Sequence, residues 1–263
     1  MRQPAIFLSH GGGPCFWLEG PVARAFDPLK AYLAGLLDAL PERPRAILIV
    51  SAHWEEPRIT LGSAKAPQMI FDYYGFPAHT YRLSYPAPGA PSLAERARGL
   101  LAAAGVEAAL DSTRGFDHGV FVPMLIVDPG ATIPIVTLSL RQDLDPAFHI
   151  AVGAALAPLR EEGVLILGSG SSFHNLRTFF DGEANAAADF DAWLTEAATN
   201  ADAKERDALL ERWSEAPFAE ACHPREEHLL PLMVVAGAAG ADVGRRVFHD
   251  RVAGKAISGF AFG

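Results

Sequence analysis

The apolar run Ile-Leu-Ile-Val at residues 47–50 constrains the fold of this chain more than any other feature. A short run of mostly β-branched residues predicts a strand buried on both faces, as in the parallel sheets of α/β proteins. The run continues into Ser51, Ala52 and His53. Ligands bind at the carboxyl ends of strands in an open α/β sheet, so we expect His53 at that rim. A lone histidine there is more often a core or capping residue, and this position alone indicates no site.

The same pattern occurs twice more along the chain. Residues 5–8 form an apolar run that leads through a serine to His10, and residues 164–167 lead through a Gly/Ser turn to His174. Parallel strands present their carboxyl ends at one edge of the sheet. Three strands of this kind would therefore bring three histidines together.

A fourth histidine precedes a predicted helix near the end of the chain. Proline is accepted in the first turn of a helix and not in its interior, so Pro231 is expected to begin this helix, with His228 in the turn before it. Imidazole is a ligand for Zn, Fe, Cu and Ni, whereas structural zinc sites more usually show cysteine pairs. The sequence therefore predicts a catalytic metal site formed by His10, His53, His174 and His228. The spacing does not choose the metal, and it does not separate a redox enzyme from a hydrolase.

Strand and helix patterns alternate between these motifs. Helices are predicted at residues 23–40, 92–104, 145–159, 184–199 and 204–214, and further strands at 58–61, 106–110 and 133–140. Ser92 and Asp145 are expected to be N-caps, and His149 is expected on an exposed helix face. This alternation predicts an α/β fold, a three-layer α/β/α arrangement around a mostly parallel or mixed central sheet. The 263 residues suit a single domain, 1–263, without linkers or repeats.

Composition excludes several classes of partner. The net charge of -9 argues against nucleic acid or an anionic membrane as the main partner. No stretch approaches the ~18 unbroken apolar residues of a membrane span, and the first residues lack signal-peptide features. Two cysteines, Cys15 and Cys222, make a disulfide framework implausible. We therefore expect a soluble cytoplasmic protein, and the sequence does not indicate its oligomeric state.

Two loops carry further candidates. The glycines at residues 11–13 would let a ligand approach the backbone closely, and the absence of a following Gly-Lys-Ser/Thr argues against a nucleotide loop. Residues 67–77 form either a loop that packs its own aromatic side chains or a pocket wall for a flat, apolar substrate. The aromatic residues there are Phe71, Tyr73, Tyr74 and Phe76. His118, in an Asp-His-Gly turn, is either a structural residue of that turn or a member of the site.

Six short motifs occur in a fixed order along the chain. They are Ser-His-Gly-Gly-Gly-Pro at 9–14, Ser-Ala-His-Trp at 51–54, Asp-Tyr-Tyr-Gly-Phe-Pro at 72–77, Asp-His-Gly at 117–119, Gly-Ser-Gly at 168–170 with His174-Asn175, and Glu-His-Leu-Leu-Pro-Leu at 227–232. Each motif alone is weak, but together they resemble the DODA-type extradiol aromatic ring-opening dioxygenases, the 4,5-DOPA dioxygenase group of the class III, LigB-like superfamily. The resemblance extends from the first strand to about Gly240.

The resemblance implies a LigB-like fold, non-haem Fe(II), O2 and a DOPA-like or other catechol that is opened to a muconic semialdehyde. By the family's pattern, His10, His53 and His228 match metal ligands. His174 matches the acid/base residue, which can also be a fourth ligand in a zinc-loaded form, and His118 matches a pocket histidine that orients substrate or oxygen. Zn can occupy such a site in isolated protein. The aromatic side chains of residues 71–76 are then expected to contact the substrate ring.

Two alternatives stay open at this point. Many extradiol enzymes use two histidines and a carboxylate, and here the matching segment offers His228 beside Glu226 and Glu227. We favour His228 as the third ligand, with Glu227 as the alternative. The alternative function is a zinc-dependent hydrolase on a similar scaffold, with His174 or Glu227 as the base for a metal-bound water. A non-enzymatic member of the family would be expected to lack site histidines, and none is missing here.

Overall fold

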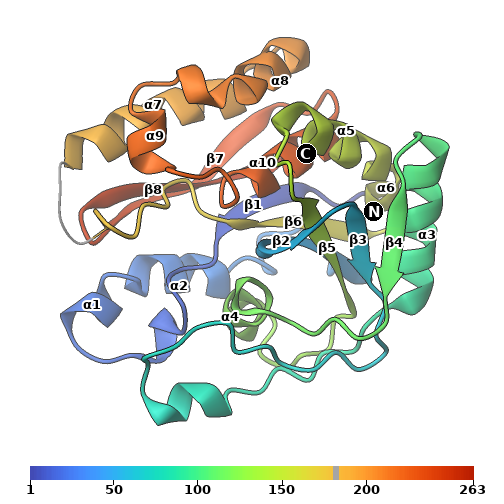
Figure 1. Ribbon diagram of the computed structural model, residues 1–263, viewed down its shortest axis with the longest axis horizontal. Helices are drawn as coiled ribbons and strands as arrows, with labels where there is room; N and C mark the ends of the chain where they lie inside the picture. Colours follow the sequence, from blue (N-terminus) through green and yellow to red (C-terminus); the bar gives the residue numbers. More distant parts are fainter. Residues whose placement is uncertain (180–183) are drawn as a thin grey trace.

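The computed structural model describes residues 1–179 and 184–263. Its strands form one sheet with the order β4-β3-β5-β2-β6-β1-β8-β7 (Figure 1). The central strands β5, β2, β6 and β1 are parallel, whereas β8 and β7 add antiparallel pairs at one side. The strands are β1 (Ala5–Ser9), β2 (Ala46–Glu56), β3 (Ile59–Gly62), β4 (Ala108–Asp111), β5 (Ile135–Arg141), β6 (Val164–Gly170), β7 (Gly244–Val252) and β8 (Lys255–Phe262).

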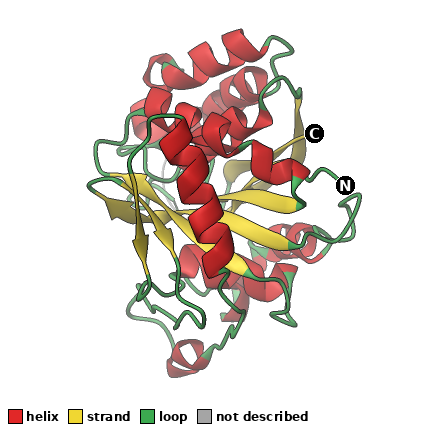
Figure 2. Cartoon of the chain, turned by 90° about the vertical axis from the view of Figure 1, so that its right-hand side faces the viewer, coloured by secondary structure: helices red, strands yellow, loops and turns green. Residues whose placement is uncertain are grey.

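Helices cover both faces of this sheet (Figures 1 and 2). They are α1 (Pro21–Arg24), α2 (Asp27–Ala34), α3 (Pro91–Ala103), α4 (His118–Val127), α5 (Pro146–Leu156), α6 (Pro158–Glu161), α7 (Ala184–Ala198), α8 (Ala203–Glu211), α9 (Ala219–Cys222) and α10 (Leu230–Ala239). Short 3-10 segments are η1 (Cys15–Trp17), η2 (Ala78–Arg82) and η3 (Trp213–Glu215). Helix α10 packs on α5, β6 and β1, and α4 packs on β2 and β6 from the other face. The predicted mixed α/β/α architecture is confirmed.

The central strands are apolar because they are enclosed by helices on both faces. Every residue of β1 and β6 is buried. Their parallel register pairs Ser9 with Gly170, and β2 is paired to the same β6 through Ser51 and Ser169. The three strands therefore reach one edge of the sheet together, and this edge is where the predicted histidines are carried.

Glycine in β6 allows the N-terminal end of α10 to approach the sheet. A Cβ on Gly170 would overlap the backbone carbonyl oxygen of His228, and a Cβ on Gly168 would lie 2.5 Å from the carbonyl oxygen of Pro231. Side chains at these two positions would push α10 outward. The Gly-Ser-Gly motif thus has a local structural reason, which is the close approach of the backbone that carries His228.

Several local predictions differ from the structure. The predicted helix at 23–40 is divided into α1 and α2 and ends at Ala34. Helix α3 begins at Pro91 rather than after a Ser92 cap, because proline suits the first position of a helix. Asp145 does cap α5, as expected. His149 is fully buried rather than exposed. The ring can be buried because both of its nitrogens are hydrogen-bonded to backbone groups.

The structure also shows the state of the two cysteines and the length and apolar character of the helices. Cys15 and Cys222 are free and buried. Across residues 1–179 and 184–263, no helix has the length and apolar character needed to cross a membrane.

Candidate active site and metal centre

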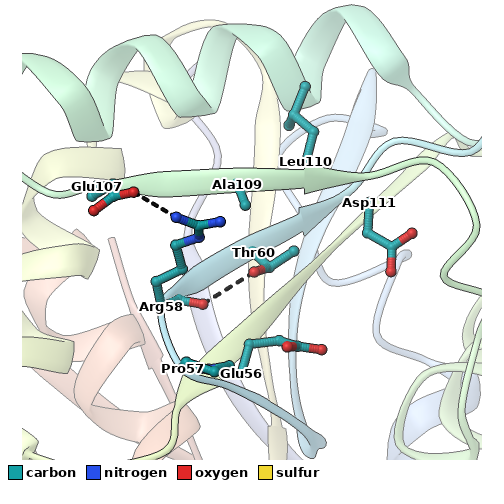
Figure 3. Close-up of a pocket in the computed structure, with 8 residues that line it drawn as sticks. All are labelled: Glu56, Pro57, Arg58, Thr60, Glu107, Ala109, Leu110 and Asp111. Carbon is teal, nitrogen blue, oxygen red and sulfur yellow. Dashed lines mark hydrogen bonds and ion pairs between the residues drawn. The ribbon is translucent and has the colours of Figure 1, made fainter.

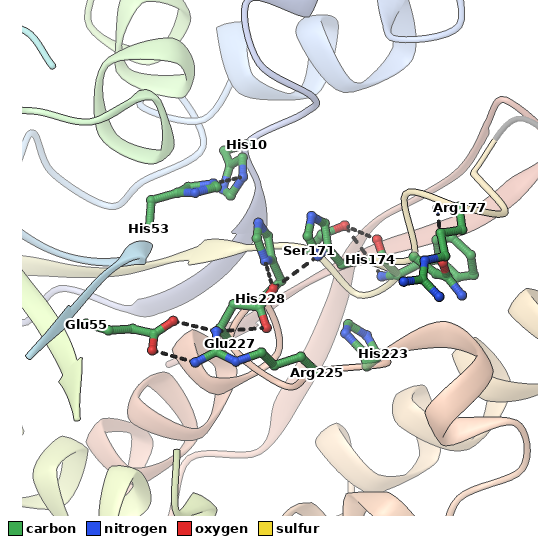
Figure 4. Close-up of polar contacts among 12 residues, drawn as sticks. His10, His53, Glu55, Ser171, His174, Arg177, His223, Arg225, Glu227 and His228 are labelled. Atoms are coloured by element: carbon green, nitrogen blue, oxygen red, sulfur yellow. Dashed lines mark hydrogen bonds and ion pairs between the residues drawn. The ribbon is translucent and has the colours of Figure 1, made fainter. Parts of the chain in front are cut away.

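Three of the predicted histidines converge at the carboxyl edge of the sheet (Figure 4). His10 follows β1, His53 lies within β2, and His228 lies just before α10. One nitrogen from each lies within 4.8 Å of the other two. The Nε2 atoms of His10 and His53 are 3.1 Å apart. Three segments of the chain thus place three imidazoles around one point, with His228 more than 170 residues from the other two in the sequence.

The neighbours of His10 determine which of its nitrogens carries the proton. The Ser169 hydroxyl donates its only proton to the backbone carbonyl of Gly119. It must therefore accept from the Nδ1–H of His10, which lies 3.1 Å away. Nε2 of His10 then carries a lone pair and faces the other imidazoles. In His228 the Nδ1–H donates to a carboxylate oxygen of Glu227 at 2.8 Å, because an ionised carboxylate only accepts hydrogen bonds. Nε2 of His228 therefore also carries a lone pair.

The three imidazoles suit a divalent cation. Burial, reinforced by the neighbouring histidines, lowers the pKa of His10 and of His228 well below the ordinary value. Burial also lowers the pKa of His53 to about 3. All three are therefore neutral at physiological pH, and neutral imidazole is the form that binds a metal. An N–N separation of 3.1 Å is compatible with two nitrogens each about 2.1 Å from one ion.

Glu227 lies behind His228 and contacts two imidazoles. One of its carboxylate oxygens is 2.8 Å from Nδ1 of His228 and 3.2 Å from Nδ1 of His174. Burial raises the pKa of Glu227, but its contact with His174 and the charge of Arg225 outweigh this effect and hold the pKa below its ordinary value. The carboxylate of Glu227 lies in a cluster with His174 and His228, and not in the cluster that contains His10 and His53. This arrangement favours His228 over Glu227 as the third candidate ligand.

His118 lies beside the cluster as the first residue of α4, rather than in a turn. Its ring centroid is 3.9 Å from that of His53. Asp72 accepts the backbone N–H of His118 at 2.9 Å, and the same oxygen lies 2.9 Å from Nδ1 of the His118 ring. Burial raises the pKa of Asp72, but the contacts with His118 lower it overall. Asp72 was missed as a functional candidate, although it begins one of the six motifs.

The first turn of α4 is fitted closely against β2. The Ser51 hydroxyl donates to the buried carboxylate of Asp117 at 2.7 Å. A Cβ on Gly119 would lie 2.7 Å from the Ser51 hydroxyl oxygen and 3.0 Å from Cδ2 of His53. Glycine at 119 therefore permits the close packing that places His118 next to His53. The Asp-His-Gly motif is a packing device as well as the source of a site histidine.

A cavity of about 800 Å³ opens over the histidines. The described residues that line it include Gly11, Gly12, Gly13, Phe26, Tyr73, Tyr74, Phe76, His118, Phe173, His174 and Leu176. Tyr73 is buried and Tyr74 is 92% exposed at the entrance. Phe71 does not line the cavity among the described residues, and instead packs beneath the loop against Tyr73, Tyr81 and Phe121. The cavity has the size and largely apolar character of a small-molecule site.

A second hollow lies away from the histidines, along β3 and β4 (Figure 3). It measures about 660 Å³. The described residues that line it contain no histidine, and Arg58 within it is paired with Glu107 at 2.7 Å. The chemistry-bearing side chains therefore gather in the first cavity.

Known proteins match nearly the whole length of this chain. The family model described as the catalytic LigB subunit of aromatic ring-opening dioxygenase matches residues 4–261. A 4,5-DOPA dioxygenase extradiol from Beta vulgaris is 39% identical over 255 residues, covering 94% of this chain and 91% of that protein. A dioxygenase named tasH from Hapsidospora irregularis is 39% identical over 276 residues, covering 99% and 85%.

A solved structure also matches. The crystal structure of an uncharacterized protein from Escherichia coli K12 has a TM-score of 0.80 and 30% identity, and the match covers 100% of both chains. None of these matches supports the zinc-dependent hydrolase that the sequence left open. The chain belongs to the LigB family of aromatic ring-opening dioxygenases, and it is an extradiol ring-cleaving dioxygenase.

Proposed function

We propose that this enzyme uses Fe(II) and O2 to open the ring of a catecholic substrate to a muconic semialdehyde. The observation that carries the proposal is the convergence of three neutral imidazoles below an aromatic-lined cavity of about 800 Å³. His10, His53 and His228 are the residues that would hold the metal. Fe(II) held by these three side chains would leave positions open for small molecules, would lower the pKa of catechol hydroxyls and would supply the reactivity toward O2.

His174 is proposed as the acid/base residue, and it is the fourth candidate ligand for a zinc-loaded form. Its Nδ1 faces Glu227 at 3.2 Å, so Nε2 is the nitrogen left to take a proton from the substrate and return it. A neutral imidazole can accept a proton on this nitrogen and later donate it, as histidine does in general acid–base catalysis. His174 lines the cavity and is partly exposed there.

His118 and the aromatic loop are proposed to position the substrate. His118 is held by Asp72 next to His53, which suits a residue that orients substrate or oxygen. Tyr73 and Phe76 provide a wall for a flat ring, and Tyr74 lies at the entrance where it can contact a ring substituent. Phe71 supports this wall from behind by packing on Tyr73. We further propose that residues 1–263 act as one catalytic domain of a cytoplasmic enzyme.

Oxygen uptake after anaerobic Fe(II) loading tests the proposal. L-DOPA, protocatechuate and plain catechol are offered in turn, and a yellow ring-opened product is expected to appear with the oxygen consumed. The variant His10→Ala should abolish uptake, whereas His79→Ala, which changes an exposed histidine on η2, should leave it unchanged. Absence of uptake with every catechol, in protein shown to hold Fe(II), would contradict the proposal. Equal turnover with Zn would contradict the choice of metal.

A further inference from the structure

The two oxygens of the Glu227 carboxylate have different neighbours (Figure 4). Oε1 is 2.8 Å from Nδ1 of His228 and 3.2 Å from Nδ1 of His174. The two imidazole rings are stacked, with centroids 3.3 Å apart and an interplanar angle of 13°. One carboxylate oxygen therefore faces the same nitrogen of two parallel imidazoles.

The other oxygen is held from the opposite side. Arg225 lies 3.5 Å from Oε2 of Glu227. The same guanidinium donates to both carboxylate oxygens of Glu55, at 2.6 and 2.5 Å. Glu55 belongs to β2, the strand that carries His53. The linked charges of Glu55, Arg225 and Glu227 thus orient the Glu227 carboxylate, so that one oxygen faces Arg225 and the other faces the imidazoles.

An ionised carboxylate only accepts hydrogen bonds. The Nδ1–H of His228 donates to Oε1, which fixes the tautomer of that ring. Nδ1 of His174 lies 3.2 Å from the same negatively charged oxygen, which attracts a proton on this nitrogen and repels a lone pair. Nε2 of His228 is then free as a ligand atom, and Nε2 of His174 is free to accept a proton. We propose that Glu227 is a positioning residue that sets one tautomer in the metal ligand and in the acid/base residue together. This inference rests on the roles assigned to these two histidines under the proposed function.

Glutamine cannot replace this carboxylate, although it has the same shape. Its amide has one accepting oxygen and one donating nitrogen. If the amide oxygen faces the two Nδ1–H groups, the NH2 group meets the guanidinium of Arg225. If it is turned the other way, the NH2 group meets the two Nδ1–H groups. Only a carboxylate offers acceptors to both sides, which makes Glu227→Gln a sharper test than truncation.

Nitrogen NMR of the metal-free protein measures the tautomers directly. His174 and His228 are expected as Nδ1–H tautomers in the unmodified chain, and Glu227→Ala should transfer a measurable fraction of both to Nε2–H. His149 is the internal standard, because its Nδ1–H donates to the carbonyl of Asp145 and should be unaffected. An Nε2–H tautomer at His174 or His228 in the unmodified chain would overturn the inference. An unchanged tautomer at either histidine in Glu227→Ala would overturn it as well.

A second measurement separates the two effects. Glu227→Gln should lower metal affinity about 10- to 100-fold in a chelator competition, and kcat should stay reduced when metal is saturating, with a smaller change in KM. The matched control Glu226→Gln changes the neighbouring carboxylate and should leave both quantities unchanged. Full recovery of kcat at saturating metal would mean that Glu227 acts on His228 alone, and the shared role would be wrong. Because the tautomers are measured without metal or substrate, failure of the proposed reaction would not be confused with failure of this inference.

Discussion

The Ser169 hydroxyl and Nδ1 of His10 lie 3.1 Å apart, although 159 residues separate them in the sequence. Ser169 also donates to the carbonyl of Gly119 in the first turn of α4. One hydroxyl therefore links β6, α4 and the candidate ligand that follows β1. Because a hydroxyl has a single proton, the link also determines which nitrogen of His10 carries a lone pair into the site.

Ser169→Ala should weaken metal binding. The change leaves the His10 Nδ1–H without its acceptor, so the ring loses the contact that sets its orientation and tautomer. We expect metal affinity to fall about 10- to 100-fold in a chelator competition. The control Ser139→Ala removes another buried hydroxyl, which accepts from the backbone N–H of Thr60 at 2.9 Å. It should destabilise the fold by about 1–3 kcal/mol without changing metal affinity. Equal affinities in Ser169→Ala and the unmodified enzyme would contradict this role.

The candidate ligands and the candidate acid/base residue should respond differently to truncation. His10→Ala or His53→Ala should abolish stoichiometric metal binding, because each removes one of the three candidate ligands. His174→Ala should retain the metal and lower kcat by roughly two to four decades, the usual range for loss of a general acid/base. Metal content by elemental analysis and kcat by oxygen uptake check these outcomes. An unchanged kcat in His174→Ala would show that its assigned role is wrong.

Gly170→Ala should displace the segment that carries His228. The new Cβ would overlap the carbonyl oxygen of His228 and would lie 3.3 Å from the Phe7 ring. We expect a loss of about 1–3 kcal/mol in the free energy of unfolding, together with weaker metal binding. The control Gly99→Ala lies in α3, where a Cβ meets nothing within 4 Å. It should stabilise the fold by about 0.5–1 kcal/mol in chemical denaturation. A neutral Gly170→Ala would contradict the packing argument.

Buried His149 predicts a pH dependence of stability away from the site. Its Nδ1–H donates to the carbonyl of Asp145 at 2.7 Å, and its Nε2 accepts from the N–H of Arg141 at 3.0 Å. Burial lowers its pKa below 6.5. Below pH 6.5 the unfolded chain therefore binds this proton first, and stability falls as the pH falls toward the folded-state pKa.

The size of this dependence can be isolated by comparing two variants. His149→Gln should reduce the slope of unfolding free energy against pH by up to about 1.4 kcal/mol per pH unit between pH 6.5 and the lower folded-state pKa. His79→Gln, at an exposed position, serves as the control. Equal slopes in His149→Gln and the unmodified chain would contradict the assignment.

Much of the fold follows from local sequence patterns. The apolar strands that end near His10, His53 and the Gly-Ser-Gly motif were predicted from runs of buried residues, and they lie side by side in the parallel core. Pro231 lies in the first turn of α10, which begins one residue earlier, at Leu230. The six ordered motifs predicted the family, which the comparisons confirm. These features depend on chain-local propensities and on a fixed order of short motifs, both of which a single sequence contains.

Only the tertiary structure decides how the site is held together. Ser169, Asp72 and Glu227 contact His10, His118 and His174, which come from other segments of the chain. These contacts are set by packing rather than by sequence spacing. Phe71 and Tyr73 are two residues apart, yet one packs beneath the loop and the other lines the cavity. The sequence by itself determined the fold class, the family and the candidate histidines. Which nitrogen of His10 faces the centre depends on its contact with Ser169 from a different strand, and no local pattern encodes that contact.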